Sequence, residues 1–288
     1  MRDGSFLTAL RNVTPAPLRP VLGRLRRALL PASLPTAAPA PPPADPDAVA
    51  APQELWHLVG AADADYVRVG QEFKRLFIEA GLRPHHAILD VGCGIGRAAA
   101  PLVDYLDENG RYAGFDVMAQ AIDWCKAHIA VGDPRFDFVH ADMHSDRYNP
   151  AGSQPASAYV FPYPDASFDY VWLGSVFTHL LAPDQAQFAR EIARVLKPGG
   201  TSIVSWYLID DEARANTGNG QIAFDMVHRL DGCWTATPEL PESVIGYDIE
   251  PILAQYDELG LDVLNQALGV WRRQPLQDQD IIVARKRA

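Results

Sequence analysis

The sequence has little of what a secreted or membrane-spanning protein needs. Its 288 residues include three cysteines, an odd number with no CxxC spacing, which suits a reducing compartment better than a disulfide framework. No apolar run approaches the roughly 20 residues of a membrane helix, and no long apolar stretch follows Met1 as a secretory signal requires. We therefore predict a cytoplasmic protein.

Basic residues are also too few for a typical nucleic-acid binder. Lysine and arginine total 25 against 36 aspartates and glutamates, which gives a formal net charge of −11. Such a charge opposes general attraction to a phosphate backbone. We expect a small molecule rather than a nucleic acid as substrate, and the sequence does not indicate an oligomeric state.

Two N-terminal segments differ from the rest of the chain in composition. Residues 1–30 hold six arginines and one acidic residue, and residues 21–30 place three leucines on one face of a short amphipathic helix. This segment could contact a membrane or a protein partner, or be a poorly ordered basic tail, because so short a helix is marginal alone. Residues 31–52 are rich in proline and alanine, which predicts an extended linker.

From residue 53 to 288 the pattern predicts one α/β domain. Residues 66–80 are amphipathic and stop at Gly81, and short apolar runs then alternate with helical segments. These runs are 87–91, 112–115, 136–139, 170–173 and 201–206. Alternation of this kind predicts a mostly parallel sheet covered on both faces.

The last two predicted strands, 261–268 and 281–286, are joined by a polar loop with no room for a helix. Such a connection makes an antiparallel hairpin, so the sheet should include an antiparallel strand. Two insertions interrupt the alternation, at residues 145–166 and 207–247.

A glycine-rich turn follows the first predicted strand. Gly92, Gly94 and Gly96 occupy alternate positions before a helix that we expect to begin near Arg97. Glycines permit a sharp turn and close approach of a ligand. The dinucleotide fingerprint GxGxxG would need a glycine where Arg97 stands. Asp90, just before the turn, can reach a ligand ammonium group directly or through water.

Acidic residues also end the second and third predicted strands. Asp116 is placed to accept hydrogen bonds from both hydroxyls of a ribose. Asp142 can accept from an adenine amino group while Met143 packs on the ring. Either aspartate could instead cap a helix, so the arrangement carries more weight than any one position.

Over residues 66–206 the chain resembles the class I S-adenosylmethionine-dependent methyltransferase family, in its small-molecule branch with a type 11/25-like domain. The matching segments, in order, are LDVGCGIG, Asp116, Ala141-Asp142-Met143, SFDYVWLGSVFTHL at 167–180 and ARVLKPGG at 193–200. The resemblance implies a Rossmann-like, seven-stranded, mostly parallel sheet with an antiparallel C-terminal hairpin strand and helices on both faces.

The resemblance also implies a cofactor and a reaction. We expect S-adenosylmethionine as the cofactor and methyl transfer to a small-molecule or glycan-component acceptor, at oxygen in preference to nitrogen or carbon. The cofactor-binding residues that we predict are Asp90, Gly92, Cys93, Gly94, Gly96, Asp116, Val117, Asp142, Met143 and Gly174.

His179 is the candidate catalytic residue. It follows the fourth strand at a distance that could bring it to the rim of the site, and a histidine with a near-neutral pKa can deprotonate a hydroxyl. It could instead hydrogen-bond within the helix that follows. We predict no metal at the HxDxH spacing of His140, Asp142 and His144, because Asp142 has a cofactor role and metal sites usually recruit ligands from other segments.

Both insertions are expected to border the acceptor. Residues 145–166 form a long loop of the kind that often covers a site, and residues 207–247 carry Phe224, His228 and Trp234, which could contact the acceptor or pack a local core. Two other functions stay open. One is a noncatalytic binding module of the same fold, and the other is an NAD(P)-dependent oxidoreductase, which the GxGxG spacing and the terminal hairpin disfavour.

Overall fold

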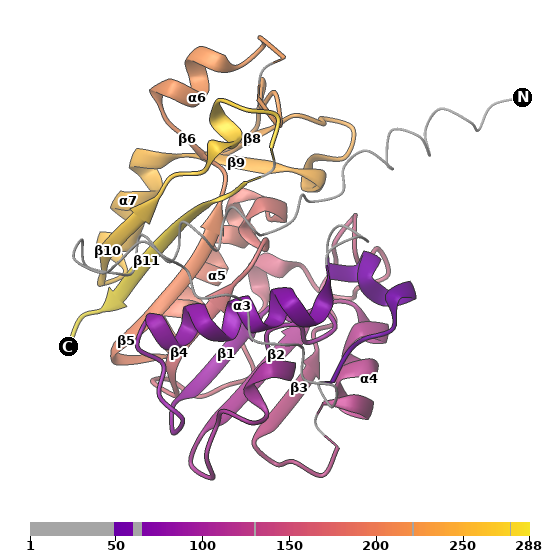
Figure 1. Cartoon of the computed structure of the whole chain (residues 1–288). Helices are drawn as coiled ribbons and strands as arrows, with labels where there is room; N and C mark the ends of the chain where they lie inside the picture. The colour runs from indigo at the N-terminus through magenta and orange to yellow at the C-terminus, as the bar shows by residue number, and fades with distance from the viewer. Residues whose placement is uncertain (1–48, 60–64, 130, 221, 277) are drawn as a thin grey trace, which may run out of the picture.

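The computed structural model describes residues 49–59, 65–129, 131–220, 222–276 and 278–288 (Figure 1). The basic segment 1–30 and nearly all of the linker 31–52 lie outside the described residues, and so do the surface helix and the extended conformation predicted for them. No helix within the described ranges is long and apolar enough to cross a membrane.

A seven-stranded sheet forms the centre of the described chain. Its order is β10-β11-β5-β4-β1-β2-β3, and β11 runs in the direction opposite to the other six strands. The strands are β1 Ala87–Val91, β2 Arg111–Asp116, β3 Phe136–His140, β4 Phe168–Leu173, β5 Leu196–Trp206, β10 Leu261–Ala267 and β11 Asp280–Lys286. The predicted mostly parallel sheet and its C-terminal hairpin are confirmed.

Helices cover both faces of this sheet (Figure 1). Since successive strand residues point to opposite faces, Ile88 and Leu89 of β1 enter different cores. Ile88 packs with residues of α3 and α4, and Leu89 packs with residues of α5 and α7. These helices are α3 Tyr66–Glu79, α4 Ala119–His128, α5 Ala182–Val195 and α7 Ile249–Glu258.

The segment after the glycine loop is not the α-helix that we predicted near Arg97. It consists of turns and the 3-10 helix η2, Ala100–Leu102. Pro101 has no amide hydrogen to donate to the Arg97 carbonyl, so regular α-helical bonding fails there. Helix α3 packs closely on this turn, since a Cβ placed on Gly70 would lie 2.6 Å from the Arg97 carbonyl oxygen.

Residues 207–247, called the cap below, contain a second and smaller sheet, in the order β6-β9-β8-β7. Figure 1 shows it beyond the upper ends of β5 and β11. Tyr207 and Trp271 belong to the apolar cluster under it. The elements are β6 Leu208–Ile209, α6 Asp211–Asn216, β7 His228–Arg229, β8 Trp234–Thr235, η5 Pro241–Ser243 and β9 Ile245–Asp248.

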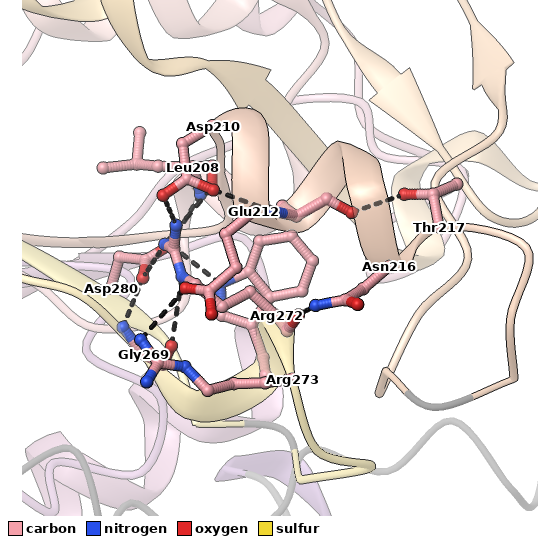
Figure 2. A network of polar contacts seen from close by, with 11 residues as sticks. Leu208, Asp210, Glu212, Asn216, Thr217, Gly269, Arg272, Arg273 and Asp280 are labelled. Atoms are coloured by element: carbon pink, nitrogen blue, oxygen red, sulfur yellow. Dashed lines mark hydrogen bonds and ion pairs between the residues drawn. The ribbon is translucent and has the colours of Figure 1, made fainter.

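A buried arginine joins the cap to the main sheet (Figure 2). Arg272, in η6 Val270–Arg272, has a fully buried side chain and forms ion pairs with Asp280 in β11 and with Asp210, the N-cap of α6. Asp280 also accepts hydrogen bonds from the Leu208 amide at 2.7 Å and from the Trp271 indole at 2.8 Å. The network therefore ties the chain that leaves β5 to the connection between β10 and β11.

Candidate active site

The glycine loop lies at the carboxyl end of β1 and is bonded to the end of β2. Gly92, Gly94 and Gly96 have φ of 74°, 53° and 70°, a region that other residues rarely adopt. The amides of Gly92 and Cys93 donate to the Phe115 carbonyl at 2.9 Å and 3.1 Å. The loop is thus a fixed turn whose path requires glycine.

Asp116 holds this loop through its side chain. One carboxylate oxygen accepts from the Gly94 amide at 2.8 Å, and the other accepts from the Met118 amide at 2.9 Å. Burial raises the pKa of Asp116, and these amides partly oppose that effect by stabilising the charge. The result is an oriented acceptor at the tip of β2, in a position where ribose hydroxyls could donate to it.

Asp90 is buried at the end of β1, where the Tyr112 hydroxyl donates to it. Burial raises the pKa of Asp90 to about 7, and the charge of Asp116 adds to the effect while Arg97 opposes it. A carboxylate in this state gains stability from a cation brought beside it. The surroundings of Asp90 are therefore compatible with a ligand ammonium group, the partner that we predicted for this residue from the sequence.

Three other predicted cofactor residues, Cys93, Val117 and Gly174, have different surroundings. Cys93 is buried under the loop, and a Cβ placed on Gly114 would lie 2.9 Å from its Cβ, so only the Cys93 backbone is available to a ligand. The Val117 carbonyl accepts from His140 Nε2 at 3.1 Å. Gly174, directly after β4, lies beside the ring of Trp172.

At the tip of β3 the two predicted residues have different surroundings. Asp142 is exposed, and Ser153 donates to its two oxygens from the backbone amide at 3.2 Å and the hydroxyl at 2.5 Å. The Ser153 hydroxyl lowers the pKa of Asp142. Met143 is buried, with 4% of its surface exposed. Asp142 is thus ionised and oriented near the surface, while Met143 belongs to the core beside it.

The HxDxH spacing does not bring metal ligands together. His144 Nε2 pairs with Asp146 at 3.0 Å, and His140 is directed to the Val117 carbonyl. Within the described ranges, no group of three His, Cys, Asp or Glu side chains could hold a metal ion.

His179, in η4 Phe177–His179, is held by two segments that are distant in sequence. Its Nδ1 lies 2.8 Å from the Glu242 carbonyl oxygen in η5, and its Nε2 lies 3.4 Å from the Tyr148 hydroxyl. Since a carbonyl only accepts, Nδ1 carries the hydrogen and Nε2 is the acceptor. Burial lowers the pKa of His179 to about 4, and the charge of Arg147 contributes. The ring is therefore neutral, with a pKa lower than the sequence led us to expect.

A polar cluster that we did not predict surrounds His179 where the 145–166 insertion meets the cap. The Ser145 hydroxyl donates to the Glu242 carboxylate at 2.6 Å, and the Arg147 guanidinium donates to the Ser243 carbonyl at 3.1 Å. The same guanidinium lies 5.1 Å from the centre of the Tyr148 ring. From the sequence we predicted only that both insertions border the acceptor, and not which of their residues contact His179.

Tyr148 connects this cluster to the cofactor half of the site. Burial raises the pKa of the Tyr148 hydroxyl, and the charge of Asp116 is near enough to raise it further. The segment that carries His179 also packs on the glycine loop, because a Cβ placed on Gly92 would lie 2.5 Å from Cγ2 of Val176, the N-cap of η4. This is at the carboxyl ends of the parallel strands, where ligands of open α/β sheets bind.

Residues 89–204 match the family model described as a methyltransferase domain. This part of the chain is a class I S-adenosylmethionine-dependent methyltransferase domain. The methyl donor of that family is S-adenosylmethionine, and the fixed glycine turn, the oriented Asp116 and the buried Asp90 fit such a cofactor.

Curated relatives match this chain over part of their length. It is 34% identical over 158 residues to methyltransferase GfsG of Streptomyces halstedii, which is 54% of this chain and 49% of the relative. It is 30% identical to the 27-O-demethylrifamycin SV methyltransferase of Amycolatopsis mediterranei, over 50% of this chain and 51% of the relative. The chain spans about half the length of the curated relatives it matches.

Solved structures share the fold of this chain at low sequence identity. The crystal structure of the [4+2]-cyclase SpnF aligns with a TM-score of 0.50 and 18% identity, over 78% of this chain and 83% of that one. That protein is named for a cyclisation, so the fold by itself does not determine the reaction.

Proposed function

We propose that the chain transfers a methyl group from S-adenosylmethionine to an oxygen atom of a small-molecule acceptor. The observation that carries the proposal is the fixed tautomer of His179, whose acceptor atom Nε2 points toward Tyr148 on the cofactor side of the cluster. The Amycolatopsis relative is named for a substrate that lacks a methyl group on an oxygen atom, 27-O-demethylrifamycin SV, and this supports oxygen as the methylated atom.

The cofactor would be held by the residues that the sequence suggested. Asp116 would accept from the ribose hydroxyls and Asp90 would lie near the ammonium group, with the backbone of the glycine loop against the ligand. Asp142 and Met143 would bind the adenine end. The remaining contacts that we propose are Cys93, Val117 and Gly174, the first two through their backbone.

His179 would take the acceptor proton. When bound, the cofactor supplies an electrophilic methyl group on a sulfonium sulfur. The acceptor hydroxyl would replace the Tyr148 hydroxyl, 3.4 Å away, as the partner of Nε2, and its O–H bond would break as the proton moves to Nε2. The Glu242 carbonyl would hold Nδ1–H throughout and so fix the orientation of the ring. Positioning supplies much of the rate of an in-line displacement, and the 145–166 insertion and the cap would provide that positioning from two sides.

Calorimetric titration with S-adenosylmethionine, S-adenosylhomocysteine and NADH tests the cofactor assignment. We expect the first two to bind, and Asp116→Ala to weaken binding by at least about tenfold through the loss of charged hydrogen bonds. Asp123→Ala, an exposed position on α4, is the matched control and should bind normally. Binding of NADH alone would contradict the proposal and favour an oxidoreductase.

Transfer of a labelled methyl group to an acceptor panel tests the reaction itself. His179→Gln should lower the transfer rate by about 10²-fold or more, because the variant has no general base to take the acceptor proton. Its affinity for S-adenosylhomocysteine should not change, because the cofactor contacts remain. Cofactor binding without transfer to any acceptor would instead favour a noncatalytic module.

A further inference from the structure

We propose that the acceptor hydroxyl is an acidic one, as in a phenol or an enol, because the surroundings of His179 keep the imidazole neutral. The inference rests on the proposed methyl transfer to oxygen and narrows its acceptor class. It is argued from the partners of the two ring nitrogens and from the charge that acts on the ring.

The partner of Nδ1 is a neutral group. Histidines that act as strong bases commonly donate this hydrogen to a carboxylate, which stabilises the imidazolium that forms. Here Nδ1 donates to the Glu242 carbonyl oxygen at 2.8 Å. The carboxylate of the same residue accepts instead from the Ser145 hydroxyl at 2.6 Å.

The charge that acts on the pKa of His179 is positive. The Arg147 guanidinium is held by the Ser243 carbonyl at 3.1 Å and by the Tyr148 ring, 5.1 Å from its centre. Burial lowers the pKa of His179 most, and the charge of Arg147 lowers it further. A guanidinium in this place disfavours an imidazolium and favours an oxyanion.

The other groups that face the ring do not reverse this balance. From the 145–166 insertion they are Arg147 and the neutral Tyr148, and from η5 there is the Glu242 carboxylate, whose pKa is raised by burial and further by Asp146. Tyr247 in β9 donates to the Leu180 carbonyl at 2.5 Å instead of to His179.

A weak base of this kind requires an acceptor that gives up its proton readily. An aliphatic hydroxyl is about as weak an acid as water, whereas a phenol has a pKa near ~10, a difference of about six orders of magnitude in acidity. The acceptor proton goes to His179 Nε2, and the acceptor oxygen forms its new bond to the methyl carbon as the sulfur–carbon bond breaks and its electron pair stays on sulfur. Arg147 and the Tyr148 hydroxyl then lie beside the developing oxyanion.

Histidine-selective NMR of the full-length chain, with ¹⁵N-labelled imidazoles, tests the site without turnover. We expect His179, assigned by its loss in His179→Gln, to hold the Nδ1–H tautomer and to titrate at least about one unit below the ordinary value of ~6.5. Arg147→Gln should raise that pKa, and Arg147→Lys, which keeps the charge, should leave it low. Arg190→Gln, an exposed position on α5, is the control.

Titration of His179 at or above its ordinary value in the unaltered chain would overturn the inference, even if the Arg147 variants did not fold. An unchanged pKa in a folded Arg147→Gln would also overturn it.

Labelled methyl transfer to a matched pair of acceptors tests the same inference with turnover. We expect 2-naphthol to be methylated at least about 100-fold faster than decahydro-2-naphthol, a saturated alcohol with the same ring connectivity. Equal or faster transfer to the saturated alcohol would overturn the acidic-acceptor inference and leave methyl transfer intact. No transfer to either, with a low His179 pKa, would contradict the methyl-transfer proposal while the neutral state of His179 stood.

Discussion

At the scale of single residues, the fold opposes the ionised form of Asp90. Burial raises its pKa to about 7, whereas an aspartate in an unfolded chain has a pKa of about 3.9. The folded chain therefore binds this proton more tightly. The corresponding stability is fully present below about pH 4 and is lost as the pH rises through about 7.

Replacing Asp90 by Asn should consequently stabilise the ligand-free chain at high pH. We expect the free energy of unfolding to rise by on the order of 1–4 kcal/mol near pH 8, with the gain shrinking toward about pH 4, because the amide cannot ionise. Urea unfolding across this range measures the effect, and exposed Asp123→Asn should show no such trend. A gain that did not depend on pH would show that Asp90 does not titrate in this way.

The sequence located some site residues and missed others for a physical reason. The placement of Asp90 and Asp116 at strand ends could be predicted, because Asp90 lies one residue before the end of β1 and Asp116 is the last residue of β2. Their contacts with a cofactor stay a prediction. The partners of His179 could not be predicted, since Tyr148 is 31 residues away and Glu242 is 63 residues away. Such contacts depend on the paths of two irregular segments, which no periodicity encodes.

At the scale of elements, the glycine loop is fitted against the segment that follows β4. A Cβ placed on Gly92 would lie 2.5 Å from Val176 Cγ2, so the two connections pack with no room for a side chain. Gly132 offers a matched comparison, because its φ of 73° is nearly the same and nothing lies within 4 Å of a Cβ there.

Gly92→Ala should therefore destabilise the chain more than Gly132→Ala. Both substitutions cost about 1–2 kcal/mol for a left-handed backbone, and only the first adds about 1–3 kcal/mol of overpacking against Val176. Thermal unfolding of the two variants measures the difference, and S-adenosylhomocysteine affinity should fall for Gly92→Ala alone. Equal losses of stability would indicate that the Val176 contact relaxes at no cost.

The elements themselves were predictable to the extent that they are long and periodic. All seven strands of the main sheet were predicted, and six of them lie within about two residues of their predicted bounds, because apolar runs of this length have few alternatives in an α/β chain. Strand β5 is the exception, since it begins at Leu196, five residues before the predicted start. The helix after the glycine loop was predicted wrongly, since Pro101 breaks its bonding. Strands β7 and β8 have two residues each, too few for any alternation to reveal.

At the scale of the whole molecule, a buried ionic network is one of the attachments of the cap to the main sheet (Figure 2). Arg272 and Asp280 are both fully buried, and Asp210 begins the first helix of the cap. The neighbouring Arg273 also forms an ion pair, with Glu212, but both of those side chains are about half exposed, at 55% and 43%. Adjacent arginines thus make one buried and one exposed connection to the same segment.

These two arginines should differ sharply in what their removal does. Arg272→Ala should lower the free energy of unfolding by about 3–5 kcal/mol, because it leaves the Asp280 carboxylate buried without its charge partner. Arg273→Ala should cost at most about 1 kcal/mol, since water screens its pair. Adding Asp280→Asn to Arg272→Met should recover part of the loss, because the uncompensated charge is gone. Urea unfolding of the unaltered chain and of these variants measures the losses. Similar small losses for both alanine variants would show that the cap is held by its apolar cluster around Trp271 rather than by the ion pairs.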